Sequence, residues 1–208
     1  MVDEEIACPK RRPTLPGILS AAEITRILDH TRNLKHWTML AMLYASALRC
    51  DELRYFKVSD IDSQRMLIHV REAKGGIPRD IPLTPRLLER LKIYWRWRRP
   101  TDWLFSSKMR PDQPMRRITL RTACNLAGRR AGIDRPVTPH VFRLSCATHM
   151  LEAGADLRTI QVLLGHADIP TTARYLRVST TRMQTAPSPF EALQLKPIYR
   201  SQDDHRQR

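Results

Sequence analysis

One short alternation of apolar and polar residues, in a chain otherwise arranged for helices, constrains the fold more than any other feature. Every second residue from Met66 to Val70 is apolar and would face one side of an extended strand. A turn with two glycines and a proline follows at residues 73–79, and residues 80–83 would form the returning strand. We therefore expect a single small antiparallel β-sheet.

Helix-capping signals divide most of the remaining chain into helices. Ser20 and Glu23 form a Ser-x-x-Glu capping box, Thr84 and Thr138 each precede a proline, and Asp156 is a further N-cap. The expected helices begin near residue 20 and at residue 84, and cover about residues 36–47, 117–131, 138–153, 157–164 and 171–178. The expected fold class is mainly α with a small antiparallel β-sheet.

The charge of the chain points to the chemistry of its partner. The 208 residues contain 36 Lys and Arg against 21 Asp and Glu, which gives a formal net charge of +15. Such a basic chain is expected to bind a polyanion, and nucleic acid is the commonest one. Arginine supplies 29 of the 36 cations, and its planar fork suits phosphate oxygens. A biased genome composition would give the same excess.

Composition also excludes several classes of protein. The longest apolar runs, such as residues 39–44, are far shorter than the ~20 residues of a membrane span. The first residues are acidic and lack an apolar run, which argues against a secretory signal. The four cysteines are widely scattered and form no C-x-x-C pair or metal-like spacing. This pattern indicates free thiols in a reducing cytoplasm. Without a Walker A or G-x-G-x-x-G motif, we expect a cytoplasmic protein with no membrane or nucleotide partner.

The residues that carry chemistry concentrate in residues 138–178. His140 and Arg143 share a face in the first turns of one expected helix, where free N–H groups and the helix dipole favour an anion. The next helix ends in Leu-Leu-Gly-His at His166, and Tyr175 follows nine residues later. Alone, His-x-x-Arg is a weak motif, whose ordinary interpretation is a capped helix with a solvated arginine.

In this order, these residues resemble the C-terminal boxes of the tyrosine recombinases, the phage-integrase family. Residues 47–53, Ala-Leu-Arg-Cys-Asp-Glu-Leu, are similar to the family's first arginine box, and Lys74 is similar to its hairpin lysine. The resemblance covers about residues 15–180. It departs from the family at Ala47, where Gly is usual, and at Leu144, where His is frequent. All six catalytic positions are filled, by Arg49, Lys74, His140, Arg143, His166 and Tyr175.

The resemblance implies the catalytic-domain fold of this family and a site-specific DNA recombinase. Such an enzyme cleaves and rejoins double-stranded DNA through a covalent 3′-phosphotyrosyl intermediate, with no metal, nucleotide or other cofactor. Four protomers would act on two DNA sites, and a monomer in the absence of DNA is compatible with this scheme. A C-terminal segment, here residues 190–195, would dock on a neighbouring protomer.

The chemistry of the residues agrees with that resemblance. Cleavage of a phosphodiester without metal requires other positive charge at the non-bridging oxygens. Arg49 and Arg143 would supply it through charge-assisted hydrogen bonds, with His166 as a third donor. Tyr175 would be the nucleophile. Because a tyrosine has a pKa of about 10, His140 and the arginine charges would help it to lose its proton.

Lys74, in the turn between the two strands, is the expected general acid for the leaving 5′-oxygen. Each residue also has an ordinary structural interpretation. Lys74 would be a surface lysine, His166 a cation at a helix C-terminus, Tyr175 a core residue, and Arg49 a partner of the carboxylates that follow it. Glu52 is expected to be structural and to orient Arg49. The ordered set of six favours the catalytic interpretation.

Around the six residues we expect three regions: a linker at 1–18, the catalytic domain at 19–185, and a C-terminal tail at 186–208. Because about 18 residues precede the first expected helix, we expect this chain to lack the N-terminal helical domain usual in the family. The candidate DNA-contacting residues are Arg116, Arg117, Arg121, Arg129 and Arg130. A charged, solvated helix face is the alternative for these five.

Other functions fit the sequence less well. A metal-dependent nuclease would need a third placed carboxylate beside Asp60 and Asp62, which are expected in a turn. His140 and His149 are nine residues apart, so they do not form a zinc pair on one helical face. Two alternatives remain open. A type IB topoisomerase-like enzyme would relax DNA with similar chemistry, and a regulator derived from a recombinase would bind DNA without cutting it.

Overall fold

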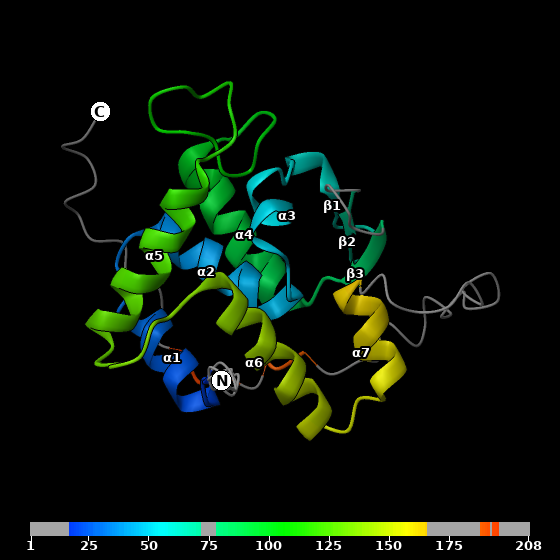
Figure 1. The fold of residues 1–208 in the computed structure, drawn as a ribbon. Helices are drawn as coiled ribbons and strands as arrows, with labels where there is room; N and C mark the ends of the chain where they lie inside the picture. The colour runs from blue at the N-terminus through cyan, green and yellow to red at the C-terminus, as the bar shows by residue number, and fades with distance from the viewer. Residues whose placement is uncertain (1–16, 72–77, 166–187, 192, 196–208) are drawn as a thin grey trace, which may run out of the picture.

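The computed structural model describes residues 17–71, 78–165, 188–191 and 193–195 (Figure 1). Its elements are α1 (Ala21–Asp29), α2 (Leu34–Ser46), α3 (Cys50–Arg54), the 3-10 helix η1 (Val58–Asp60), β1 (Ile61–Asp62), β2 (Leu67–Val70), β3 (Arg79–Pro82), α4 (Pro85–Arg98), α5 (Arg117–Arg130), α6 (Pro139–Glu152) and α7 (Leu157–Leu164). The predicted fold class, mainly helical with a small antiparallel sheet, is confirmed. Within this part of the chain, no helix is long and apolar enough to cross a membrane.

Four helices, α1, α4, α6 and α7, begin where the capping residues predict, whereas α3 was not predicted and the helix expected at 171–178 lies outside the described residues. Ser20 and Glu23 form both halves of a capping box at α1. Thr84, Thr138 and Asp156 each accept a hydrogen bond from a backbone N–H in the first turn of α4, α6 and α7. These side chains satisfy donors that the first turn of a helix leaves without a partner. The sequence therefore specifies these helix starts locally.

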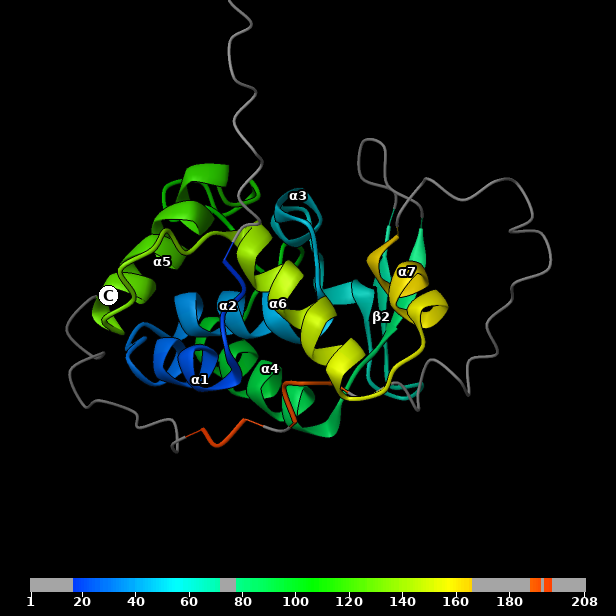
Figure 2. The ribbon, with the colours of Figure 1, turned by 60° about the horizontal axis from the view of Figure 1, so that its bottom comes forward.

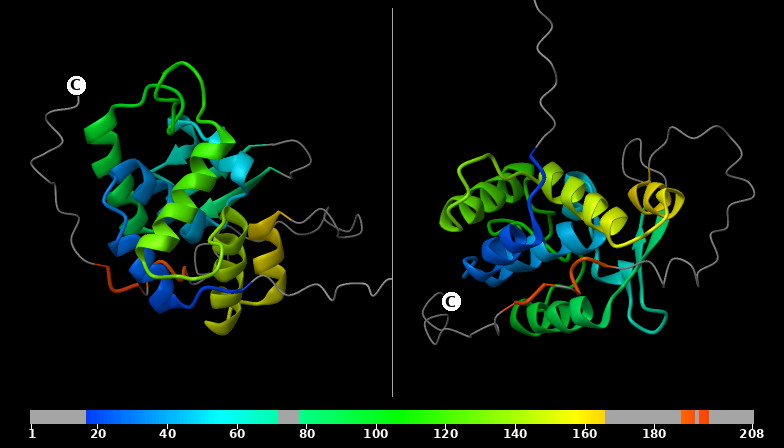
Figure 3. Two further views of the ribbon diagram at one scale, coloured as in Figure 1. Left: turned by 60° about the vertical axis from the view of Figure 1, so that its left-hand side comes forward. Right: turned by 90° about the horizontal axis from the view of Figure 1, so that it is seen from below.

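Helix α2 forms the centre of the core. Its residues from Met39 to Tyr44 are all fully buried, as a helix that is apolar on every side requires. It packs against α4, α5 and α6. The right-hand view of Figure 3 shows α4 on one side of α1 and α2, with α5 and α6 on the other. Leu40, Leu43 and Leu48, predicted to be buried, are fully enclosed.

The sheet has three antiparallel strands in the order β1-β2-β3, with Ile68 of β2 paired to Ile61 on one side and to Ile81 on the other. The sequence predicted two of them. The prediction of a turn at Asp60 and Asp62 was wrong, because Asp60 lies in η1 and Asp62 in β1. A two-residue strand is too short to show alternation. Helix α7 packs against β3 (Figure 2).

A short C-terminal segment returns to the core of the same chain. Phe190 and Leu193 are buried, and the ring of Phe190 meets Trp37 edge-on at 6.2 Å between centroids. Arg86 of α4 donates to the backbone carbonyls of Phe190 and Glu191, at 3.1 and 2.8 Å. Docking of this segment on a neighbouring protomer stays a prediction.

Candidate active site

Arg49 stands at the entrance to α3, held by a residue of the same helix. Glu52 accepts a hydrogen bond from the Arg49 backbone N–H at 2.7 Å and another from its Nη1 at 3.0 Å. Glu52 therefore orients both the backbone and the guanidinium of Arg49, as expected. Two residues earlier, Ala47 ends α2 with a φ of 47°, in the left-handed region that favours glycine. This backbone conformation explains why glycine suits the position where the chain carries Ala47.

Arg143 lies on α6 and is only 7% exposed. Its Nη1 donates to the Ala47 carbonyl at 2.6 Å, and its Nη2 donates to the Leu164 carbonyl at 2.5 Å. Burial, followed by the charge of Arg49, lowers the pKa of Arg143 to about 10, and Glu52 acts in the opposite direction. The side chain is therefore a buried cation at neutral pH.

A third arginine, Arg79 of β3, completes the cluster. Its Nη1 and Nη2 donate to the two carboxylate oxygens of Glu52 at 2.8 and 2.9 Å, and its Nε donates to the Leu163 carbonyl at 2.6 Å. Burial raises the pKa of Glu52, but the hydrogen bonds and charge of Arg79, together with the contacts of Arg49, outweigh burial and lower it to about 2. Glu52 is therefore an anion that two guanidinium groups share.

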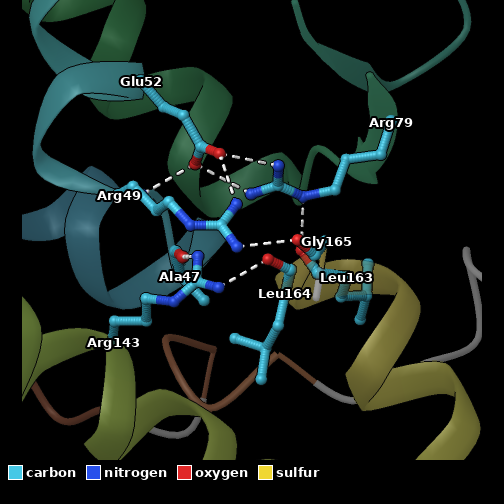
Figure 4. A network of polar contacts seen from close by, with 8 residues as sticks. All are labelled: Ala47, Arg49, Glu52, Arg79, Arg143, Leu163, Leu164 and Gly165. Carbon is cyan, nitrogen blue, oxygen red and sulfur yellow. Dashed lines mark hydrogen bonds and ion pairs between the residues drawn. The ribbon is translucent and has the colours of Figure 1, made fainter. Parts of the chain in front are cut away.

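The C-terminal end of α7 is the meeting point of the three arginines (Figure 4). The carbonyls of Leu163, Leu164 and Gly165 accept from Arg79, Arg143 and Arg49 respectively, the last at 2.7 Å. The last carbonyls of a helix lack intrahelical partners and form the negative end of its dipole, so cations are favoured there. Gly165 then leaves the helix in the left-handed conformation, with a φ of 59°. The arginines thus fix where the chain departs toward residue 166.

The other predicted catalytic residues divide into two groups. His140 lies exposed in the first turn of α6, three residues before Arg143. Lys74, His166 and Tyr175 lie outside the described residues. The structure therefore brings Arg49 and Arg143 together and places His140 on the same helix as Arg143.

The five candidate DNA-contacting arginines are all exposed and belong to α5 or its N-cap. Arg117 forms an ion pair with Asp51, which also pairs with Arg54 at 2.6 Å. Helix α5 packs against α3, so the N-terminal end of α5 adjoins the segment that begins at Arg49.

Sequence reasoning missed Arg79. The returning strand was expected to start at Asp80, which leaves Arg79 in the turn. The structure extends β3 by this one residue and buries Arg79 on the same side as Ile81. The period-2 spacing of Arg79 and Ile81 was the available signal, since residues i and i+2 of a strand face the same side.

Comparison with known proteins agrees with this architecture. Residues 18–182 match the model of the phage integrase family. A putative integrase/recombinase of Sinorhizobium fredii, y4qK, is 45% identical over 190 residues, which cover 91% of this chain and 61% of the relative. Tyrosine recombinase XerA of Pyrococcus horikoshii is 36% identical over 187 residues, which cover 88% of this chain and 64% of XerA. The chain thus spans somewhat less than two thirds of these two relatives.

The solved structures that the chain matches are also recombinases and integrases. The chain matches the crystal structure of a XerA recombinase with a TM-score of 0.69 and 29% identity, over 89% of this chain and 65% of that one. It matches the integrase of mycobacterium phage Brujita with a TM-score of 0.74 and 25% identity, over 95% of this chain and 64% of that one. On the match that spans α1 to α7, and on the arginine cluster at its centre, this chain belongs to the phage integrase family, the tyrosine recombinases.

Proposed function

We propose that this chain is the catalytic domain of a site-specific tyrosine recombinase, which cleaves and rejoins double-stranded DNA through a covalent 3′-phosphotyrosyl intermediate at Tyr175. One observation carries the proposal. Arg49, the N-cap residue of α3, and Arg143 of α6 meet at the C-terminal end of α7, the helix that the Tyr175 motif follows in sequence.

The electrostatics of this cluster suit a phosphodiester. Among the residues that the structure describes, Glu52 is the one carboxylate bound by this cluster: it pairs with Arg49 and Arg79, and Arg143 adds a third positive charge nearby. Arg143 donates to two neutral carbonyls, and these contacts do not compensate its charge. The attacked phosphate accumulates further negative charge on its non-bridging oxygens in the transition state. Fixed guanidinium groups stabilise that charge without reorganising.

The remaining steps are assigned to the other members of the motif. Tyr175 attacks the scissile phosphorus and forms the phosphotyrosyl ester, while the bond from phosphorus to the 5′-oxygen breaks. Lys74 gives its proton to that departing oxygen. His140 assists removal of the tyrosine proton, and His166 donates to the same phosphoryl oxygens as the arginines. Rejoining reverses these transfers, so the reaction consumes no nucleotide.

We assign DNA contact first to the N-terminal half of α5, with Arg116, Arg117 and Arg121. This end of α5 packs against α3. Asp51 of α3, which lies two residues after Arg49, forms the ion pair with Arg117. At a rise of 1.5 Å per residue, Arg129 lies about 18 Å further along the helix than Arg117. Arg129 and Arg130 therefore belong to a more distant part of the same basic surface.

The proposed partner is double-stranded DNA, held by four copies of the chain. Two relatives that share this fold were solved with DNA: XerH in a pre-cleavage complex with its difH substrate, and the Tn1549 transposon integrase with transposon right end DNA. Integration and excision of mobile elements are among the reactions that such an enzyme performs. Its proposed place of action is the cytoplasm.

A nicked duplex from which a short cleaved strand diffuses away tests the mechanism, because it traps the covalent intermediate. Incubated with this DNA in EDTA, the wild-type chain is expected to form a detergent-resistant adduct. Tyr175→Phe is expected to bind the same DNA and form none. An adduct with Tyr175→Phe would reassign the nucleophile. Relaxation of supercoiled DNA without recombinant products would indicate a topoisomerase-like enzyme, and binding without an adduct a regulator.

A further inference from the structure

We propose that Arg79 is a positioning residue for phosphate activation, a role that rests on the proposed function. It acts through two routes: it orients Arg49 by way of Glu52, and it fixes the end of α7 from which the chain continues to His166. It does not act on the departure of the 5′-oxygen.

The burial of Arg79 shows that it acts through other residues. Its side chain is only 4% exposed, and all three of its guanidinium nitrogens donate hydrogen bonds within the protein. Burying a cation is costly unless it is paired and hydrogen-bonded. An arginine enclosed in this way presents no free edge to a DNA phosphate, so it differs from Arg49, whose side chain is 35% exposed.

The first route runs through Glu52. Arg79 binds both carboxylate oxygens in the bidentate geometry, at 2.8 and 2.9 Å, which fixes the plane of the carboxylate. The same two oxygens hold the backbone N–H and Nη1 of Arg49. Arg79 also shares the negative charge of Glu52. Without Arg79, that charge would be left to Arg49 and would neutralise the guanidinium that has to face the phosphate.

The second route runs through the end of α7. Arg79 Nε donates to the Leu163 carbonyl at 2.6 Å. A Cβ atom built on Gly165 would lie 2.9 Å from Arg79 Nη1 and 3.1 Å from Arg79 Cδ. The arginine therefore occupies the space beside Gly165 as well as bonding to the turn before it. This packing holds Gly165, the residue that precedes His166 in the sequence.

Both routes lead to groups proposed to bind the non-bridging oxygens, and this separates Arg79 from Lys74. A substrate that lacks charge at those oxygens should depend less on Arg79. A substrate with a better leaving group should depend on Arg79 as strongly as before. A residue that merely stabilises the fold would affect every substrate equally.

The experiment compares three nicked duplexes under single-turnover conditions with saturating protein. The first has an ordinary scissile phosphodiester. The second has a methylphosphonate there, in which a neutral methyl replaces one charged oxygen. The third has a sulfur atom in place of the 5′-bridging oxygen, so its departure needs no general acid. The variants are Arg79→Lys and Lys74→Ala, with Arg65→Gln, an exposed arginine in the turn between β1 and β2, as the matched control.

On the ordinary duplex, Arg79→Lys is expected to cleave roughly 100-fold more slowly than wild type, the scale of a displacement of about 1 Å at a catalytic group. On the methylphosphonate duplex this deficit should shrink at least tenfold, and on the sulfur duplex it should persist. Lys74→Ala should show the opposite pattern, with its deficit relieved by sulfur. Arg65→Gln should match wild type on all three.

Two results would overturn the assignment. An equal deficit of Arg79→Lys on all three duplexes would reduce Arg79 to a structural residue, and relief by sulfur would place its action on the leaving group. If Arg79→Lys does not fold at the assay temperature, Glu52→Gln interrupts the first route and is expected to give the same substrate pattern. Failure of the proposed function itself would give a different result from failure of the Arg79 assignment, because the wild-type chain would then form no Tyr175 adduct on the ordinary duplex.

Discussion

The molecule contains two groups of arginines that differ in their surroundings: a cluster at the end of α7 and an exposed row on α5. Arg49 and Arg79 bind one carboxylate, and both converge with Arg143 on the end of α7, whereas the arginines of α5 are exposed. In the first group both terminal guanidinium nitrogens of each arginine donate to a named acceptor, so geometry determines the effect of a substitution. In the second group, which we propose to contact the DNA backbone, only the sum of charges is expected to matter. Position in the fold, and not residue type, therefore decides how much one arginine contributes.

The largest difference between the two groups is expected in the cleavage rate. Arg143→Gln removes a fixed cation that we propose to contact the scissile phosphate, so cleavage of the nicked duplex should fall roughly 10²–10³-fold. Arg129→Gln, at the far end of α5, should leave the rate at saturating DNA unchanged. Rapid-quench measurement of adduct formation checks both. Equal losses in the two variants would erase the distinction between the groups.

The next difference concerns stability. Glu52→Ala leaves Arg79 buried without its anionic partner, and breaking a buried pair in this way costs about 3–5 kcal/mol. Replacing the exposed Glu89 by Ala should change the free energy of unfolding by about 0.5 kcal/mol or less. Urea unfolding followed by circular dichroism measures both. A Glu52→Ala variant as stable as Glu89→Ala would show that the cluster does not hold α3, β3 and α7 together.

The pH dependence of the free energy of unfolding tests the role of the Glu52 carboxylate separately. Its pKa falls from 4.5 to about 2 on folding, so its contribution is complete above pH 4.5 and is lost as the pH falls toward 2. A shift of this size corresponds to roughly 3 kcal/mol. Wild type should therefore lose about that much more stability than Glu52→Gln between pH 5 and 2. Parallel curves for the two proteins would contradict the assignment.

The smallest expected effect concerns the exposed arginines of α5 and the salt dependence of DNA binding. Arg121→Gln should weaken DNA binding uniformly across sequences and reduce the slope of log affinity against log salt by about 1. Arg117→Gln should reduce it less, because Asp51 already balances that charge. Fluorescence anisotropy over a series of salt concentrations measures the slopes. If Arg117→Gln gave the larger change, the ion pair with Asp51 would have to open on DNA.

The fold was predictable where the information is local. Ser20, Thr84, Thr138 and Asp156 cap their helices with side chains that act within three residues, so a single sequence reveals them. Strand β1 was not predictable, because its two residues are a strand only through pairing with β2.

The candidate site was predictable only in part, for the same reason. Arg49 and Arg143 belong to motifs of fixed spacing, and Glu52 lies one helical turn from Arg49. Arg79 gains its role from α7, which lies 84 residues further along the chain. Its acceptor there is a backbone carbonyl, a group that every residue carries and no sequence pattern marks. The charge on a side chain can be read from sequence, but the acceptor that it meets depends on the tertiary fold.

The hydrogen bonds of the cluster have a consequence for folding. They join residues separated by 84, 96 and 116 positions along the chain, and contacts between such distant residues require large loops to close first. Helices α2 and α4 need no such closure to form their own turns. The cationic centre therefore exists only after α7 has docked, and a nascent or partly opened chain lacks it. Late assembly would withhold the proposed DNA cleavage from every molecule that has not finished folding.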